Sequence, residues 1–245
     1  DPPGDDSVAG IDRGRETRHR GTFEDCAQGQ IDLECLAHAR RELRGQERLL
    51  ENRGRLADRT GIDPERARMA WQQHGVVVNR SSPEGILARV RHEPCDGWWS
   101  DEPGQGMMLL TADCLPVAIA RANGAKPALA ILHVGWRGLL DGIVGNGVAA
   151  LGEGPLAAAV GPGIGPCCYE VGPEVAKPYT ARFGAEVAEG RKLDLWRAAE
   201  LALNEAGVME VERTDLCTFC HPELFFSHRR DRGITGRQGV IAAVT

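Results

Sequence analysis

Short apolar runs of strand length recur from about residue 69 onward, and they constrain the fold of this chain more than any other feature. Apolar spacing typical of helices follows at residues 138–151 and 193–208, and Gly207 ends the second of these. The expected strands lie at residues 76–78, 85–90, 107–120 and 127–134, at the start of 156–171, and after the loop of the C-terminal tail. The pattern predicts a single α/β domain of layered, α+β-like construction, with mixed β-sheets flanked by helices.

The first fifty residues do not share this pattern. Residues 31–60 carry leucines among many charges, which predicts one or more surface helices, with Gly45 and Gly54 weakening the middle. We therefore treat residues 1–50 as an atypical N-terminal segment and residues 51–245 as the main domain. We expect the N-terminal segment to be poorly packed and largely helical or disordered.

Bulk composition excludes several classes of protein. A chain of 245 residues that is 42% hydrophobic is long enough for one sizeable core. Its formal net charge of −6 gives no general support for nucleic-acid binding. No apolar run reaches the length needed to cross a bilayer, and the polar N-terminus lacks a signal-peptide core. We therefore expect a cytoplasmic protein with neither nucleic acid nor membrane as a partner.

Three side chains with metal-binding chemistry stand in or beside the apolar runs. They are His74 in "WQQHGVVV", Cys114 in "LLTADCLPVAIA" and His133 in "ILHVGWRG". Zinc accepts imidazole and thiolate, and a site with three protein ligands leaves its fourth position for water or substrate. A single histidine or cysteine in an apolar run is more often a core residue. Spacing alone therefore leaves both interpretations open.

The other cysteine motifs carry less information. The segment "CTFCH", from Cys217 to His221, resembles a haem-attachment motif or half of a zinc motif. A zinc ribbon needs a second cysteine pair of similar spacing, which this sequence lacks, and covalent haem would suit an exported protein. The adjacent Cys167 and Cys168 are unlikely to form a disulfide with each other. We assign no metal to these four cysteines from the sequence.

Two glycine-bearing loops offer groups that could bind an anion. "GPGIGP" at residues 161–166 could present backbone amides, but it lacks the residues of a phosphate loop, so a structural turn is at least as good an explanation. The tail "SHRRDRGITGR" gathers four arginines, which can clamp phosphate or carboxylate or form a solvated basic loop: Arg229, Arg230, Arg232 and Arg237.

Taken in order, "QQHG", "TADCLPV", "HVGWRG", "GPGIGPCCYEV" and "FFSHRRDRGITGRQG" resemble the laccase-domain family, whose members are also described as polyphenol oxidases, purine nucleoside phosphorylases and peptidoglycan editing factors. The resemblance covers residues 51–245, which it identifies as a laccase-domain-like catalytic domain. It implies a layered fold similar to that of certain bacterial cysteine hydrolases. It also implies that His74, Cys114 and His133 bind the metal. Residues 1–50 lack the strand-bearing stretch that family members usually carry there.

The activity that the resemblance implies is phosphorolysis of adenosine, inosine and methylthioadenosine, with adenosine deamination at the same site. The partners would be a purine nucleoside and phosphate, and the cofactor zinc. The implied catalytic residues are Cys114 and His133, with Arg137 and Arg53 holding phosphate. We expect a monomer or a homodimer.

Three alternatives stay open at this point. A copper polyphenol oxidase would add Met107 or Met108 to two histidines and a cysteine, but a multicopper enzyme also needs a histidine-rich second cluster, and the sequence has no His-x-His motif. A cysteine hydrolase editing peptidoglycan precursors would use Cys114 as nucleophile and His133 as base. The atypical N-terminus also fits a binding protein without catalytic activity.

Overall fold

The computed structural model describes residues 33–82, 94–121 and 126–245, with residues 33–46 described by their backbone only. The strand predicted at 85–90 and most of the expectation for residues 1–50 lie outside the described residues. The chain forms two compact units, Asp1–Leu49 and Leu50–Thr245. The second unit contains the six-stranded, three-stranded and two-stranded sheets and the candidate site.

One helix, α2, spans Leu33–Thr60 and so runs through both Gly45 and Gly54. In the second unit its last turns pack on apolar side chains, because Ala57 is fully buried against Ala67 and Met108. The helix is rich in charges, and among the described residues no helix combines the length and apolarity needed to cross a membrane. The last turns of α2, around Ala57, therefore belong to the packed domain.

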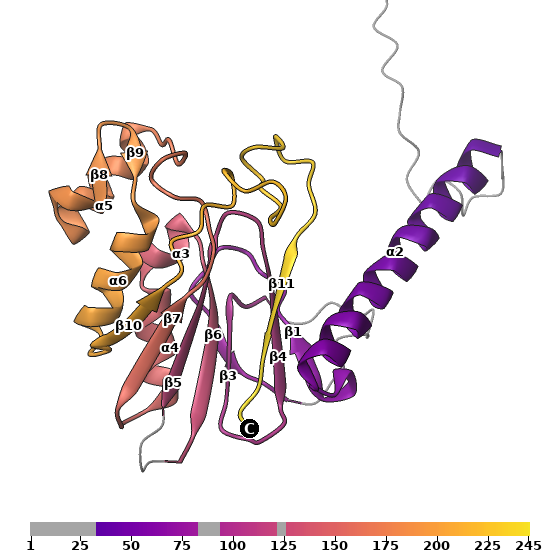
Figure 1. Ribbon diagram of the computed structural model, residues 1–245, viewed down its shortest axis with the longest axis horizontal. Coiled ribbons are helices and arrows are strands. Elements are labelled where there is room, and N and C mark those ends of the chain that lie inside the picture. The colour runs from indigo at the N-terminus through magenta and orange to yellow at the C-terminus, as the bar shows by residue number, and fades with distance from the viewer. Residues whose placement is uncertain (1–32, 83–93, 122–125) are drawn as a thin grey trace, which may run out of the picture. The chain divides into compact units, whose positions relative to one another are not determined.

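The main sheet has six strands in the order β10-β7-β5-β6-β3-β2 (Figure 1). The pairs β5–β6, β5–β7 and β3–β6 are antiparallel, whereas β10–β7 and β2–β3 are parallel, so the sheet is mixed as predicted. In sequence order its strands are β2 (Val78–Arg80), β3 (Gly97–Ser100), β5 (Leu115–Arg121), β6 (Ala128–Val134), β7 (Leu156–Val160) and β10 (Glu210–Arg213).

Helices cover one face of the main sheet and a smaller sheet covers the other. The small sheet, β1-β4-β11, shares a buried cluster with the main sheet in which Trp98, Met107 and Ile131 meet. Burial on both faces explains why β5 and β6 are almost continuously apolar. The remaining elements are β1 (Ala67–Met69), β4 (Gly106–Thr111), β11 (Gln238–Ala242), α3 (Trp136–Asp141), α4 (Ile143–Leu151), α5 (Pro173–Phe183), α6 (Leu195–Glu205), β8 (Ala188–Glu189), β9 (Lys192–Leu193), and the 3-10 helices η1 (Pro64–Arg66) and η2 (Ala185–Val187).

Three sequence predictions need correction. The run 107–120 is two strands, β4 and β5, which belong to different sheets and are separated at Asp113, whose φ is +90°. The predicted helix 138–151 is broken into α3 and α4 at Gly142, whose φ of +98° is left-handed. The strand predicted at 76–78 begins only at Val78. In the first two cases both halves are buried, so apolar spacing alone could not show the break.

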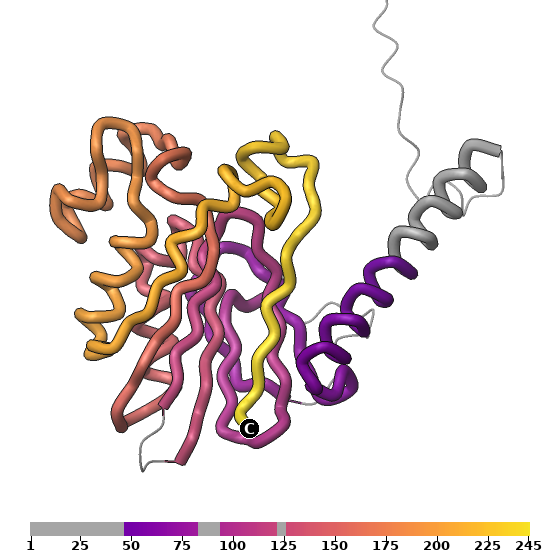
Figure 2. The backbone as a smooth tube through the Cα atoms, in the orientation of Figure 1, coloured from indigo at the N-terminus to yellow at the C-terminus, as the bar shows by residue number. Residues whose placement is uncertain are grey.

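The loops that follow β4 and β7 lie at the same end of the two sheets as the long loop of the C-terminal tail. Figure 2 shows this tail, in yellow, passing over that end before it descends as β11. The backbone confirms the proximity, because the amide of Ile164 donates to the carbonyl of Asp113. Loops from distant parts of the sequence therefore meet at one end of the sheets.

We predict that removing residues 1–45 leaves the thermal midpoint within about 2 °C of that of the full chain. For a domain of this size, such a shift corresponds to a change of less than about 1 kcal/mol in the free energy of unfolding. The physical reason is that the packing described for α2 lies after this point, where Ala57 is buried. Calorimetry of the two proteins measures the difference. A cooperative loss of folding on truncation would contradict the prediction.

The buried turn of α2 supplies the matched comparison. Ala57→Glu should lower the thermal midpoint by several degrees, because it forces a charge into a site with no solvent exposure. The neighbouring Asp58 is exposed, so Asp58→Ala should leave the midpoint nearly unchanged.

Candidate metal centre

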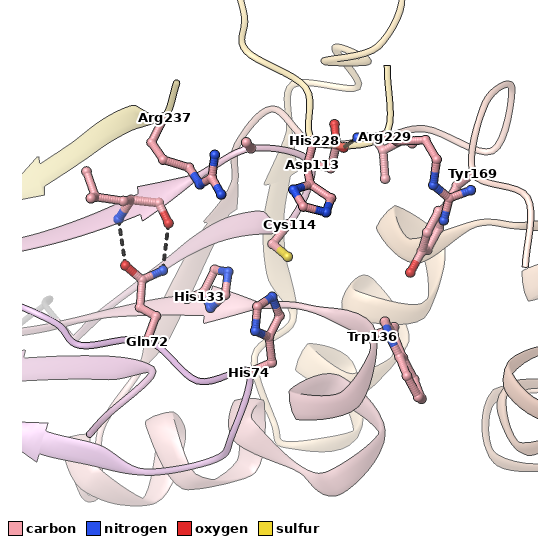
Figure 3. A pocket seen from close by; sticks show the side chains of 13 residues that line it. Gln72, His74, Asp113, Cys114, His133, Trp136, Tyr169, His228, Arg229 and Arg237 are labelled. Carbon is pink, nitrogen blue, oxygen red and sulfur yellow. Dashed lines mark hydrogen bonds between the residues drawn. The ribbon is translucent and has the colours of Figure 1, made fainter. Parts of the chain in front are cut away.

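The structure brings the three predicted ligands together. His74 comes from the loop before β2, Cys114 from the connection between β4 and β5, and His133 from the end of β6. Their ligand atoms all lie within 4.8 Å of one another (Figure 3). The two imidazole rings meet edge to face, with centroids 4.8 Å apart.

Two glycines of the "HVGWRG" motif make this approach sterically feasible. A Cβ on Gly135 would lie 2.9 Å from Cδ2 of His74 and 3.2 Å from Sγ of Cys114. A Cβ on Gly138, in α3, would lie 2.6 Å from the carbonyl oxygen of Gly75. The start of α3 therefore packs directly against the loop that carries His74, and larger residues there would push the ligands apart.

A residue that the sequence analysis did not identify, Asp96, organises the centre. Its carboxylate accepts hydrogen bonds from the amides of Gln73 (3.1 Å), His74 (2.8 Å) and Gly75 (2.7 Å). The same carboxylate accepts Nδ1–H of His133 at 2.8 Å. His74 has a φ of +61°, which is unusual for a residue with a side chain, and the three amide bonds hold that turn.

The hydrogen bond to Asp96 also fixes the chemistry of His133. Because Nδ1 donates to the carboxylate, Nε2 is the nitrogen available for a ligand, an arrangement common for metal-binding histidines. In the sequence, Asp96 stands before Gly97, a pair typical of an exposed turn. It is in fact 1% exposed, directly before β3.

Electrostatics favour charged groups in the centre. Burial alone would raise the pKa of Asp96, but hydrogen bonds from His133 and from the amides of Gly75 and Gln73 hold it below its ordinary value. Burial also opposes ionisation of the Cys114 thiol, yet contacts with His133 and His74 lower its pKa to about 7. Burial would lower the pKa of His133, but Asp96 and Cys114 raise it to about 9. Cys114 and His133 therefore each stabilise the charged form of the other.

The donor set fits a zinc ion. Two imidazoles and one thiolate converge from three segments, and one imidazole is oriented by a carboxylate. Zinc sites with three protein ligands of this kind keep a fourth position for water or substrate. The residues that would hold the metal are His74, Cys114 and His133.

A cavity of about 490 Å³ opens over the three ligands. Trp136 and Tyr169 form an aromatic wall on one side of it (Figure 3), and Ile164 also lines it. Figure 3 shows Arg237 on the opposite side from Trp136 and Tyr169, with the ligands between them. The cavity therefore offers an aromatic surface, a metal donor set and a cation in succession.

The tail loop supplies three polar residues that line the cavity: His228, Arg229 and Arg237. Nη1 of Arg237 donates to the carbonyls of Gly236 (2.8 Å) and Thr235 (3.1 Å). Arg229 lies 5.2 Å above the ring of Tyr169. The arginine cluster noted in the sequence thus contributes two of its four members to the cavity.

Asp113 ties the loops around the cavity together. Its carboxylate accepts the hydroxyl of Thr218 at 2.6 Å and the amide of Arg229 at 2.7 Å. Its own carbonyl accepts the amide of Ile164. The residue directly before the ligand Cys114 therefore fixes that ligand relative to both the tail loop and the loop after β7.

The structure places the other two predicted site residues away from the cavity wall. Arg137 is exposed on α3, and its guanidinium lies 4.9 Å over the ring of Trp136. Arg53 is 8% exposed on α2. Neither is among the residues that line the cavity. The sequence motif predicted their presence in the site without information on where their side chains point.

Comparisons with known proteins agree with the motifs. The sequence model of a family described as "Multi-copper polyphenol oxidoreductase laccase" matches residues 34–245. Purine nucleoside phosphorylase of Xylella fastidiosa (strain 9a5c) is 38% identical over 203 residues, which are 78% of this chain and 76% of that protein. Purine nucleoside phosphorylase YfiH of Escherichia coli (strain K12) is 35% identical over 195 residues, 76% of this chain and 77% of that protein. The resemblance drawn from the motifs is confirmed.

A solved structure supports the fold. The crystal structure of Bacillus licheniformis hypothetical protein YfiH aligns with a TM-score of 0.75 at 28% identity, covering 82% of each chain.

The family match begins within α2 at residue 34, ahead of residue 51, where the quoted motifs place the start of the catalytic domain.

We predict that Asp96→Asn weakens zinc binding about ten- to a hundredfold, the usual effect of losing the partner of a ligating histidine. The amide cannot accept all four hydrogen bonds that the carboxylate accepts, so both His74 and His133 lose their support. Competition with a chelating dye measures the affinity. As a control, Asp101→Asn removes a surface carboxylate that pairs with Arg80 and should leave zinc affinity unchanged. Equal affinity in the Asp96 variant and the native protein would refute the organising role of Asp96.

Proposed function

We propose that this chain is a zinc-dependent purine nucleoside phosphorylase. It belongs to the laccase-like multi-copper polyphenol oxidoreductase family, and several of its relatives are named purine nucleoside phosphorylase. Its substrates would be adenosine, inosine and methylthioadenosine with phosphate, and it would also deaminate adenosine. We place it in the cytoplasm as a monomer or homodimer. The observation that carries the proposal is the order of groups across the cavity: aromatic wall, ligand cluster, arginine.

The aromatic wall suits a purine base. Trp136 and Tyr169 both line the cavity, and aromatic rings stabilise stacked bases by about 1–3 kcal/mol each. Trp136 is held in place through its backbone, since its carbonyl accepts the hydroxyl of Tyr179 at 2.6 Å. A base bound there would direct its sugar towards the ligand cluster.

Arg237 is the side chain best placed to bind phosphate. It lines the cavity across from the aromatic wall, and its hydrogen bonds within the described residues go to carbonyls rather than to a carboxylate. Its positive charge is therefore available to an anion. The sequence-based proposal gives this role to Arg137 and Arg53, and an Arg137→Ala variant, described below, tests its first half.

Phosphorolysis joins a phosphate oxygen to the anomeric carbon of ribose while the bond from that carbon to the base nitrogen breaks. The base leaves with the bonding electron pair and takes up a proton. His228 lines the cavity, and histidine is the side chain that most often acts as a general acid. When bound, zinc would act as a Lewis acid that polarises a substrate group or the water needed for deamination.

The copper alternative lacks its expected fourth ligand. Met107 and Met108 are both buried in β4, at 0% and 3% exposure, and neither lines the cavity. A cysteine hydrolase is compatible with the low pKa of Cys114 beside His133. The test below distinguishes these activities.

We predict that zinc-loaded protein releases adenine from adenosine only when phosphate is present, and that it forms inosine or hypoxanthine more slowly. Chromatography of the products with and without phosphate measures both reactions, and the protein should be colourless. Oxidation of phenols together with inactivity towards adenosine and phosphate would replace this proposal with the copper enzyme. Hydrolysis of peptidoglycan precursors without activity towards adenosine and phosphate would favour the cysteine hydrolase. Absence of all three activities would favour a binding protein.

Two arginine variants locate the phosphate. Arg237→Ala should lower kcat/KM for phosphate about ten- to a hundredfold, because a lost hydrogen bond to a charged group costs about 1.5–3 kcal/mol. Deamination should fall less, since water needs no guanidinium partner. Arg137→Ala should have a smaller effect on phosphate use, because that guanidinium lies over Trp136. A larger loss with Arg137→Ala than with Arg237→Ala would return the phosphate role to Arg137.

A further inference from the structure

Four cysteines outside the first centre form a second cluster. Cys167 and Cys168 follow the glycine-proline loop, and Cys217 and Cys220 come from the segment after β10. Their four Sγ atoms all lie within 4.8 Å of one another. Sγ of Cys220 is 3.6 Å from that of Cys167 and 3.4 Å from that of Cys168. The cluster shares no residue with the His74, Cys114 and His133 centre.

The backbone brings these two segments together. Gly163 and Cys217 form a parallel β-bridge, in which the amide of Gly163 donates to Leu216 and that of Thr218 donates to Gly163. The amide of Gly165 donates to Sγ of Cys217 at 3.3 Å, a contact that stabilises negative charge on sulfur. The approach of the cysteines is therefore built into the fold.

A backbone hydrogen bond closes the turn that carries Cys217 and Cys220. The amide of His221 donates to the carbonyl of Cys217 at 3.2 Å, which closes the Cys-x-x-Cys turn. Cys-x-x-Cys pairs are a common source of two zinc ligands. A zinc ribbon takes its other two ligands from a second Cys-x-x-Cys pair, whereas this fold supplies the adjacent cysteines Cys167 and Cys168, the latter 52 residues before Cys220.

We propose that Cys167, Cys168, Cys217 and Cys220 bind a second zinc ion. Four thiolates around zinc, each at about 2.3 Å, lie about 3.8 Å from one another in a tetrahedron. The two sulfur–sulfur contacts of Cys220, 3.4 and 3.6 Å, and the 4.8 Å upper limit for all pairs bracket that separation. A disulfide needs about 2.05 Å, and all four cysteines are free. Without a cation, four thiols packed this closely would lose contact with water and gain only weak S–H hydrogen bonds in return.

The second zinc would have a structural role. Four protein ligands leave no open position for a substrate. Tyr169, which follows Cys168, lines the substrate cavity, and Thr218, which follows Cys217, donates to Asp113. The ion would therefore join the loop that carries Tyr169 to the loop that supports Asp113.

Metal content of purified variants tests the proposal. Native protein, purified under reducing conditions and equilibrated with zinc, should contain two zinc ions per chain. Cys114→Ser should retain one, and the double variant Cys217→Ser/Cys220→Ser should also retain one. As the matched control, Cys95→Ala removes a buried cysteine outside both groups and should retain two. One zinc in the native protein and none in Cys114→Ser would overturn the proposal.

A second measurement keeps the test valid if the double variant does not fold. Cys114→Ser leaves all four cluster cysteines intact, so this protein loaded with cobalt should show intense thiolate-to-cobalt charge-transfer absorption. Alkylation followed by mass spectrometry should find the four cysteines protected by zinc and exposed by a chelator. Absence of that absorption, or a disulfide from Cys220 to Cys167 or Cys168 in the reduced preparation, would overturn the second site. Neither readout depends on activity towards nucleosides.

Discussion

The candidate centre depends on one buried carboxylate, that of Asp96. It holds the left-handed turn at His74 through three backbone amides and orients His133 through Nδ1. Its backbone carbonyl also accepts the amide of His133 at 2.7 Å. Two ligands from separate segments are thus fixed by a single side chain, which fixes their relative position before any metal binds.

The third ligand is fixed by a different carboxylate. Asp113 adopts a φ of +90° and accepts hydrogen bonds from Thr218 and Arg229. This arrangement makes the connection between β4 and β5 a rigid part of the cavity. The antiparallel register that pairs Pro116 with His133 then places Cys114 beside the histidine. Hence the sheets supply the framework, and two aspartates hold the ligands on it.

Much of this fold follows from the sequence, because buried strands read as apolar runs: β6 and β7 lie where they were predicted. The break between β4 and β5 could not be predicted, since both strands are buried and only the sheet to which each belongs differs. Helix α5 was missed, and it contains Pro178, a residue that ordinarily argues against a helix.

The ligands of the centre were found through motifs, whereas their supports were not. An aspartate before a glycine is typical of an exposed turn, so nothing local marked Asp96 as buried. Arg137 was favoured because it belongs to a motif, yet the cavity is lined instead by Arg229 and Arg237. The second cysteine cluster could not be predicted, because Cys168 and Cys220 are 52 residues apart and only the tertiary fold brings them together. Side-chain direction and long-range contacts are what a single sequence does not carry.

Anomalous diffraction at the zinc edge, from crystals of the zinc-loaded protein, tests the organising role of Asp96 most directly. The account predicts a peak bonded to Nε2 of His133, with Nδ1 still hydrogen-bonded to Asp96 and with His74 and Cys114 as the other protein ligands. A zinc ion bonded to Nδ1 of His133, or a His133 ring turned away from Asp96, would contradict it.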